Sequence, residues 1–315
     1  MKNWLKVLLL AAFTMILVAG CSTKAPGSTE EPATSGENKG APATDSMKLG
    51  LSISTLNNPF FVTLKEGAEA EAKKQGIQIT TIDAQNDPAK QISDIEDLIQ
   101  QGVSALIINP TDSAAVVSAI ESANNAGIPV ITVDRSAEGG EVVAHIASDN
   151  AAGGKMAGEF ILETLGNKGK IVELEGIPGS SAARERGEGF HSAVDGVEGV
   201  EVVAKQAADF DRAKGLTVME NILQGNKDIQ AVFAHNDEMA LGALEALAAA
   251  GLKDVLVVGF DATEDAVKAV EDGRMGATVA QKPDLIGQKG VETAISVIKG
   301  EKVEEFIPVE LELIK

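Results

Sequence analysis

The sequence is short of the residues that disulfides, metal centres and nucleophilic catalysis require. It has one cysteine, three histidines and no tyrosine, and aromatic residues make up only 3% of its 315 positions. A single cysteine forms no intrachain disulfide and no thiolate-rich metal site. The histidines, His145, His191 and His235, match no metal-binding spacing. We therefore expect no metal and no cofactor, and we interpret the histidines as structural or solvent-facing.

Basic residues are also scarce. The chain has 27 Lys and Arg against 47 Asp and Glu, which gives a formal net charge of -20. Nucleic-acid binding needs clustered cations to neutralise phosphates, so we exclude it. A hydrophobic content of 44% with 23% charged residues is typical of a packed globular protein. The length predicts about two domains.

Long apolar runs are missing except near the start, at 7–18. That run is shorter than the roughly 20 residues needed to cross a bilayer, and Lys2 and Lys6 precede it. We interpret 1–20 as a secretory signal peptide. The stretch LVAGC resembles a bacterial lipoprotein box and predicts a lipid on Cys21, holding an exported protein at the outer face of the cytoplasmic membrane. The alternative is an ordinary signal peptide with an incidental cysteine.

Residues 22–46 lack large apolar side chains and consist of Ser, Thr, Pro, Gly, Ala, Glu, Asp, Lys and Asn. Such a segment buries too little surface to fold, so 21–46 is interpreted as a lipid anchor followed by a flexible tether. The folded part is expected to begin near Met47.

From there, short apolar runs alternate with stretches of helical apolar spacing, which favours parallel sheets covered on both faces. Glycines that are typical of helix ends precede several of the runs, as at Gly76, Gly102, Gly127 and Gly251. About eleven strands are too many for one such sheet. We expect two doubly wound α/β lobes. The predicted strands are 48–54, 77–83, 105–109, 129–133, 143–148, 170–175, 200–206, 230–234, 255–260, 276–280 and 307–314.

Ligands of open parallel sheets bind beyond the carboxyl ends of the strands, and here those ends are polar and aromatic. No glycine-rich phosphate loop is present, because Ser192 interrupts the one partial G-x-G-x-x-G pattern. No nucleophile elbow or cysteine nucleophile is present either. The acidic pairs Asp209/Asp211 and Asp237/Glu238 are interpreted as helix caps and first-turn acids rather than a glycosidase pair. We therefore predict a binding protein and no enzyme.

Four charged strand-end residues balance one another: Asp134 and Asp261 against Arg135 and Arg186. A zero sum suits an uncharged ligand. Sugar hydroxyls both donate and accept hydrogen bonds, and their C–H faces pack on aromatic rings. The sequence thus favours a small neutral polyol.

Long stretches of 47–315 resemble the periplasmic sugar-binding proteins of ABC transporters, namely STLNNPFFV, INPTDS, HIASDN, SAARERGEGF, ADFDR, NDEMALGAL, VVGFD and KGVETA. The resemblance implies the type I periplasmic binding protein fold, with three hinge crossings near 148–149, 281–282 and 309–310. It implies an N-terminal lobe of 47–148 plus 282–309 and a C-terminal lobe of 149–281 plus 310–315.

The resemblance further implies D-ribose as the ligand, an ABC transporter permease as the partner and a monomeric protein. Another neutral sugar, such as allose, xylose or a furanosyl signalling molecule, is the alternative. A sugar-responsive repressor would need an N-terminal helix-turn-helix where a signal peptide stands. The implied ligand contacts are Asn58, Phe60, Phe61, Asp134, Arg135, Arg186, Phe210, Asn236, Asp261 and Gln281.

Six of these contacts also have a simpler structural interpretation. Asn58 before Pro59 is typical of a helix cap, and Phe60 and Phe61 suit a core. Arg186 has Glu185 and Glu188 within reach on one helix, and Asp134 with Arg135 suits a surface pair. His235 departs from the family, which often has Gln at that position.

Overall fold

The computed structural model describes residues 47–315. Its first sheet has six parallel strands in the order β11-β5-β4-β3-β1-β2. The strands are β1 (Lys48–Ile53), β2 (Gln78–Asp83), β3 (Ala105–Ile108), β4 (Val130–Val133), β5 (Ala144–Ser148) and β11 (Phe306–Val309). The predictions for 1–46, including the signal peptide and the lipid on Cys21, concern residues outside the described part of the chain.

The second sheet repeats this topology in the order β12-β10-β9-β8-β6-β7. Only β12 runs antiparallel, against β10, within this sheet. The strands are β6 (Gly169–Glu175), β7 (Val200–Ala207), β8 (Ala231–Ala234), β9 (Leu256–Asp261), β10 (Ala277–Ala280) and β12 (Glu312–Ile314).

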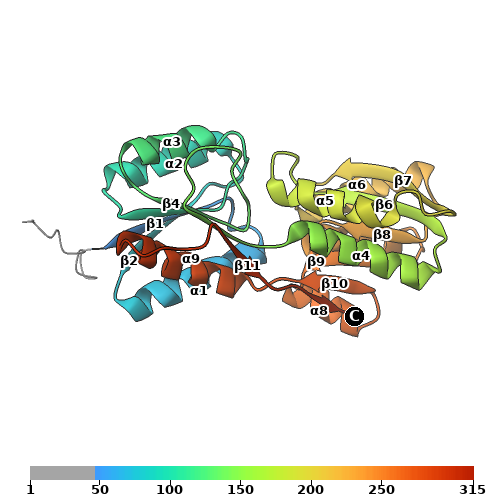
Figure 1. The fold of residues 1–315 in the computed structure, drawn as a ribbon. Coiled ribbons are helices and arrows are strands. Elements are labelled where there is room, and N and C mark those ends of the chain that lie inside the picture. Colours follow the sequence, from blue (N-terminus) through green and yellow to red (C-terminus); the bar gives the residue numbers. More distant parts are fainter. Residues whose placement is uncertain (1–46) are drawn as a thin grey trace, which may run out of the picture. The chain divides into compact units, whose positions relative to one another are not determined.

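Helices cover both faces of each sheet (Figure 1). In the first lobe they are α1 (Pro59–Gln75), α2 (Pro88–Gln100), α3 (Val117–Asn125) and α9 (Pro283–Ile298). In the second lobe they are α4 (Asn150–Leu165), α5 (Ser181–Val194), α6 (Arg212–Gly225), α7 (Asp237–Ala249) and α8 (Glu264–Glu271). Side chains of α1 and α9 pack on one face of the first sheet and those of α2 and α3 on the other. The predicted doubly wound architecture is confirmed.

Local sequence signals place the helix ends. Asn58 and Asp87 cap α1 and α2, and each is followed by a proline at the first helical position. The four glycines that were expected to end helices all adopt positive φ, between 69° and 76°. Residues with a Cβ seldom adopt a positive φ, which explains why glycine occupies these four helix ends.

The chain passes between the two sheets three times, after β5, after β10 and after β11. In Figure 1, α9 and β11, drawn in red, lie with the blue and green elements of the first lobe. The single predicted strand 307–314 is wrong, because the chain forms β11 in the first sheet and β12 in the second. Apolar periodicity does not report the sheet to which a strand belongs. Within 47–315 no helix is both long and apolar enough to cross a membrane.

Candidate functional site

The carboxyl ends of the strands of both sheets meet at one small cavity. Nine of the ten predicted contact residues line it together with Ala182, and the tenth, Gln281, lies directly behind it. All ten are at most 9% exposed, although most are polar. Buried polar side chains need partners, so we describe their contacts in turn.

The start of α1 supplies the amide and two aromatic rings. The Oδ1 of Asn58 accepts from the N–H of Phe60 at 2.9 Å, so the expected capping role is confirmed. The rings of Phe60 and Phe61 meet edge to face, with centroids 5.1 Å apart. Both also belong to the core of the first lobe. The core interpretation and a place at the cavity therefore hold together.

Asp134 and Arg135 form a buried pair and not a surface pair. Nε of Arg135 lies 3.6 Å from Oδ2 of Asp134, and within 47–315 it has no hydrogen-bond partner. The guanidinium lies over Phe61 and Phe210, at 5.0 Å and 5.2 Å from their ring centroids. Burial lowers the pKa of Arg135 to about 10, so it remains a cation at neutral pH.

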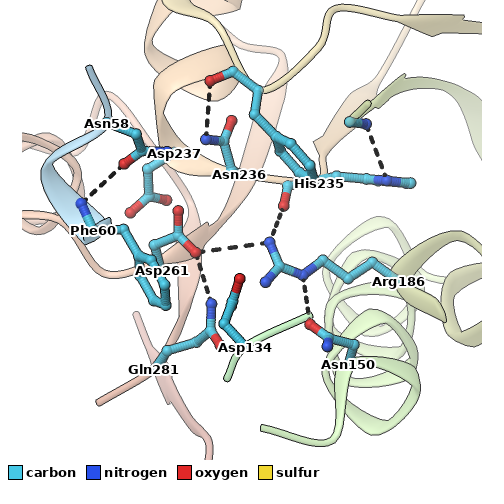
Figure 2. Close-up of polar contacts among 12 residues, drawn as sticks. Asn58, Phe60, Asp134, Asn150, Arg186, His235, Asn236, Asp237, Asp261 and Gln281 are labelled. Carbon is cyan, nitrogen blue, oxygen red and sulfur yellow. Dashed lines mark hydrogen bonds and ion pairs between the residues drawn. The ribbon is translucent and has the colours of Figure 1, made fainter. Parts of the chain in front are cut away.

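Arg186 is held by three groups of the second lobe (Figure 2). Its Nε donates to Oδ1 of Asn150 at 2.8 Å, and its Nη1 donates to the carbonyl of His235 at 2.6 Å. Nη1 also lies 3.7 Å from Oδ1 of Asp261. The helix-surface pairing considered with Glu185 or Glu188 does not form. The guanidinium instead stacks over Phe260 at 3.8 Å.

Phe210 and Asn236 come from the turns after β7 and β8. Phe210 adopts a φ of 60°, which turns its ring toward the cavity wall formed with Arg135. Asn236 caps α7 by accepting from the N–H of Met239 at 3.0 Å, and its Nδ2 donates to the carbonyl of Phe210 at 3.3 Å. The two turns are thereby tied together.

Asp261 ends β9, and its Oδ1 accepts from Nε2 of Gln281 at 2.8 Å (Figure 2). Burial raises the pKa of Asp261 well above its ordinary value, although the charge of Arg186 opposes this rise. The formal charges of Asp134 and Arg135 from the first lobe and of Asp261 and Arg186 from the second sum to zero. The four residues that were predicted from the sequence to balance therefore line one cavity.

Two further residues of the site were missed. Asn109 follows β3, is fully buried, and donates from Nδ2 to Oδ2 of Asp134 at 3.0 Å. Asn150 starts α4 and anchors Arg186. The reasoning applied to the ends of the first and fourth strands applies equally to Asn109, which was passed over. Asn150 lies two residues beyond the fifth strand, so the same reasoning applies to it, and it was passed over as well.

His235 has a structural role. Its Nδ1 accepts from the N–H of Gly176 at 3.4 Å, so the neutral ring carries its proton on Nε2, which lies 2.9 Å from Oε1 of Glu173. The other oxygen of this fully buried carboxylate lies 2.9 Å from Nε2 of His191. The histidines thus partner a buried acid. Among residues 47–315, no group of three or more His, Cys, Asp or Glu side chains is arranged to hold a metal.

The lobes also touch outside the cavity. The N–H of Ser113 donates to the carbonyl of Gly179 at 2.9 Å, and the N–H of Ser136 donates to Oγ of Ser181 at 2.9 Å. The described part of the chain is therefore closed around the cavity. A wider hollow lies beside α7 with exposed Glu245, Lys253 and Lys268 on its rim, and it contains none of the predicted contacts.

Comparison with known proteins agrees with this architecture. A family model described as periplasmic binding protein domain matches residues 49–302. The chain belongs to the periplasmic binding protein family. Membership confirms the predicted family, the two-lobed fold and the prediction of a solute-binding protein in place of an enzyme.

Individual relatives are similar over most of the chain. The sequence is 55% identical over 313 residues to the ribose import binding protein RbsB of Bacillus subtilis strain 168, with 99% of each chain covered. It is 58% identical over 266 residues to RbsB of Escherichia coli strain K12, covering 84% of this chain and 90% of the other. The solved structure of the Caulobacter myo-inositol binding protein bound to myo-inositol matches with a TM-score of 0.83 at 36% identity, covering 87% of this chain and 95% of that one.

Proposed function

We propose that this chain binds D-ribose in the cavity between its lobes and delivers it to the permease of an ABC importer. The observation that carries the proposal is the cavity itself, around which each lobe places one aspartate and one arginine. Paired charges of this kind accept from and donate to sugar hydroxyls without attracting an ionic ligand. The relatives from Bacillus subtilis and Escherichia coli, which are named as ribose import binding proteins, support ribose as the choice.

The walls of the cavity support a monosaccharide. Phe61 and Phe210 offer aromatic faces to sugar C–H groups. Nε of Arg135, buried without a hydrogen-bond partner in the described chain, needs an acceptor, and a sugar oxygen would supply one.

In the proposed mechanism a sugar that contacts both lobes favours the closed arrangement. A ligand shifts such an equilibrium only by the difference between its affinities for the open and the closed state. The four charged residues and the three aromatic rings of the cavity come from both sides of the hinge, so their contacts are complete only when the lobes are closed. The three connections between the sheets would act as the hinge.

Isothermal titration calorimetry with D-ribose and a panel of neutral sugars tests this function. We expect Asp134→Ala and Arg186→Ala each to weaken ribose binding by roughly 1.5–3 kcal/mol, because each removes a charge-assisted hydrogen bond. Arg274→Ala, which alters an exposed pair with Asp272, is the matched control. Wild-type affinity in both site variants would refute the site. If another sugar binds more tightly than ribose, that sugar becomes the proposed ligand. Candidates are allose, xylose or a cyclitol like the one bound by the Caulobacter protein.

We also propose that the protein is exported as a monomer and held at the outer face of the cytoplasmic membrane by a lipid on Cys21. The support is the sequence LVAGC at the end of the apolar run and the periplasmic character of the family. Intact mass of the membrane-extracted protein should show an acylated Cys21, and Cys21→Ser should release the protein from the membrane. An unmodified Cys21 in membrane-bound protein would contradict the anchor.

A further inference from the structure

The turn that presents Asp261 to the cavity has an unfavourable backbone. Asp261 and Ala262 adopt φ values of 119° and 56°, and neither is glycine. Residues with a Cβ seldom occupy these regions, and such strain persists only where neighbouring groups hold it in place. The groups that hold this turn therefore also decide where the carboxylate of Asp261 lies.

Two buried side chains hold it. Oδ2 of Asp237 accepts from the N–H and from the hydroxyl of Thr263, at 2.7 Å and 3.2 Å. Oδ1 of Asp237 accepts from the hydroxyl of Thr278 at 2.7 Å, and Oγ1 of Thr278 accepts from the N–H of Ala262 at 3.2 Å. The two residues that follow Asp261 in the chain are thus both tied, directly or through Thr278, to Asp237.

The strands β9 and β10 leave room for the carboxylate of Asp237. Thr278 of β10 lies in register with Gly259 of β9. A Cβ at Gly259 would come within 2.3 Å of Oδ1 of Asp237, so only glycine fits there. Both Asp237 and Thr278 are fully buried, and Asp237 does not line the sugar cavity. Any influence of Asp237 on the ligand must therefore pass through another residue.

That residue is Asp261. Its carboxylate lies 2.8 Å from Nε2 of Gln281 and 3.7 Å from Nη1 of Arg186. A shift of the turn would move the acceptor away from both groups and from the cavity. Figure 2 draws Asp237 together with these residues of the site.

We propose that Asp237 is a positioning residue for sugar binding: through its hydrogen bonds to Thr263 and Thr278 it fixes the strained turn that aims Asp261 at the ligand. This proposal rests on the proposed function of the cavity. It assigns the effect to the oxygen atoms of Asp237 as acceptors and not to its charge. Asparagine would keep one acceptor for Thr263, and its amide would donate to Oγ1 of Thr278.

A double-mutant cycle with calorimetry tests the route through Asp261. We expect Asp237→Ala to weaken binding of the sugar that the wild type binds by roughly tenfold, from the loss of several buried hydrogen bonds. Asp237→Asn should stay within about threefold of the wild type. In an Asp261→Asn background, Asp237→Ala should have little further effect. An equal loss in both backgrounds, or equal losses for Asn and Ala, would overturn the proposal.

Hydrogen exchange in the ligand-free protein separates this proposal from the proposed function and controls for folding. The amides of Ala262 and Thr263 should exchange faster in Asp237→Ala and Thr278→Val, while amides of β6 and β8 keep their protection. If they do not, Asp237 does not hold the turn and the proposal is wrong. If they do but the wild type binds no neutral sugar, the turn is held as described and the proposed function fails, and with it the positioning role.

Discussion

The turn after β3 in the first lobe and the turn after β8 in the second occupy equivalent positions in their sheets. The N–H of Asn109 donates to the carbonyl of Ser52 at 2.8 Å, and the N–H of His235 donates to the carbonyl of Leu174 at 2.9 Å. Each acceptor lies on the strand next to the turn, β1 or β6. Asn109 and His235 are therefore counterparts.

The side chains of Asn109 and His235 each accept a hydrogen bond from a backbone N–H, although one is an amide and the other an imidazole. Oδ1 of Asn109 accepts from the N–H of Ser54 at 3.1 Å, and Nδ1 of His235 accepts from the N–H of Gly176 at 3.4 Å. The donor groups of the two side chains point in different directions. The amide of Asn109 reaches Asp134 in the cavity, whereas the ring of His235 faces away toward Glu173. In the first lobe, the residue at this position hydrogen-bonds to Asp134 of the site. In the second lobe, it is the hydrogen-bond partner of the buried Glu173.

The strand ends differ in a similar way. Asp134 directly follows β4 and Asp261 ends β9, and both adopt positive φ. Two residues beyond Asn109 the first lobe has Thr111, and two residues beyond His235 the second lobe has the carboxylate of Asp237. An uncharged amide supports the acid in the first lobe, whereas a second buried acid supports it in the second. One topology therefore accepts two different supports for one ligand-binding carboxylate.

The largest expected difference between the lobes is in how the free energy of unfolding depends on pH. Burial raises the pKa of Asp237 from 3.8 to about 7. The folded protein therefore binds the proton of Asp237 more tightly than the unfolded chain does. The stabilisation that this proton gives to the fold is fully present below pH 3.8 and is lost as the pH rises through 7. In urea unfolding of the ligand-free protein, the wild type should lose on the order of 4 kcal/mol relative to Asp237→Asn between pH 4 and pH 8.

Thr111→Val is the matched control for that comparison, because the first lobe has no ionisable group at the position. Its free energy of unfolding should differ from the wild type by an amount that does not depend on pH. Parallel pH curves for the wild type and Asp237→Asn would contradict the raised pKa of Asp237.

The next effect separates the counterparts Asn109 and His235. His235→Ala should lower the free energy of unfolding by about 3 kcal/mol, because it leaves Glu173 buried with one donor fewer and orphans the N–H of Gly176. His235→Gln keeps an acceptor and a donor and should lose less than half as much. Asn109→Ala should lose about 1–2 kcal/mol. Urea unfolding at pH 7 measures all three, and equal losses for Ala and Gln at 235 would rule out the hydrogen-bonding role.

The smallest effect concerns ligand affinity at Gly176 and its counterpart Ser54. A Cβ at Gly176 would lie 2.0 Å from the ring of Phe210, and the φ of Gly176 does not require glycine. Gly176→Ala should therefore displace Phe210 and weaken ribose binding by about tenfold. Ser54→Ala, which removes a buried hydroxyl without a partner in the described chain, should change affinity less than twofold. Calorimetry on both variants checks the pair, and an unchanged affinity for Gly176→Ala would show that the ring position does not matter.

Most of the fold and the cavity lining was predictable from the sequence. Near-continuous Val, Ile and Leu runs located the strands, and parallel strands of one sheet place their carboxyl ends at one edge, so residues as distant as Asn58 and Asp134 were expected together. Glycine and proline signals marked the helix ends correctly. The resemblance to a family supplied what periodicity alone did not, above all the three crossings between the sheets.

The supports behind the cavity were not predictable in the same way. Asp237 was interpreted as a first-turn acid, which it is, but nothing in its spacing shows that Thr263 and Thr278 converge on it. The partnership of Glu173 with His235 spans 62 positions and two strands that pair only in the folded sheet. Such contacts depend on sheet register, which a single sequence does not reveal.

A crystal structure of the protein with D-ribose would show whether both lobes bind the sugar. We expect one sugar in the cavity, with hydroxyl contacts to Asp134 and Arg135 from the first lobe and to Asp261 and Arg186 from the second, between the rings of Phe61 and Phe210. A sugar bound by residues of one lobe alone, or outside this cavity, would contradict it.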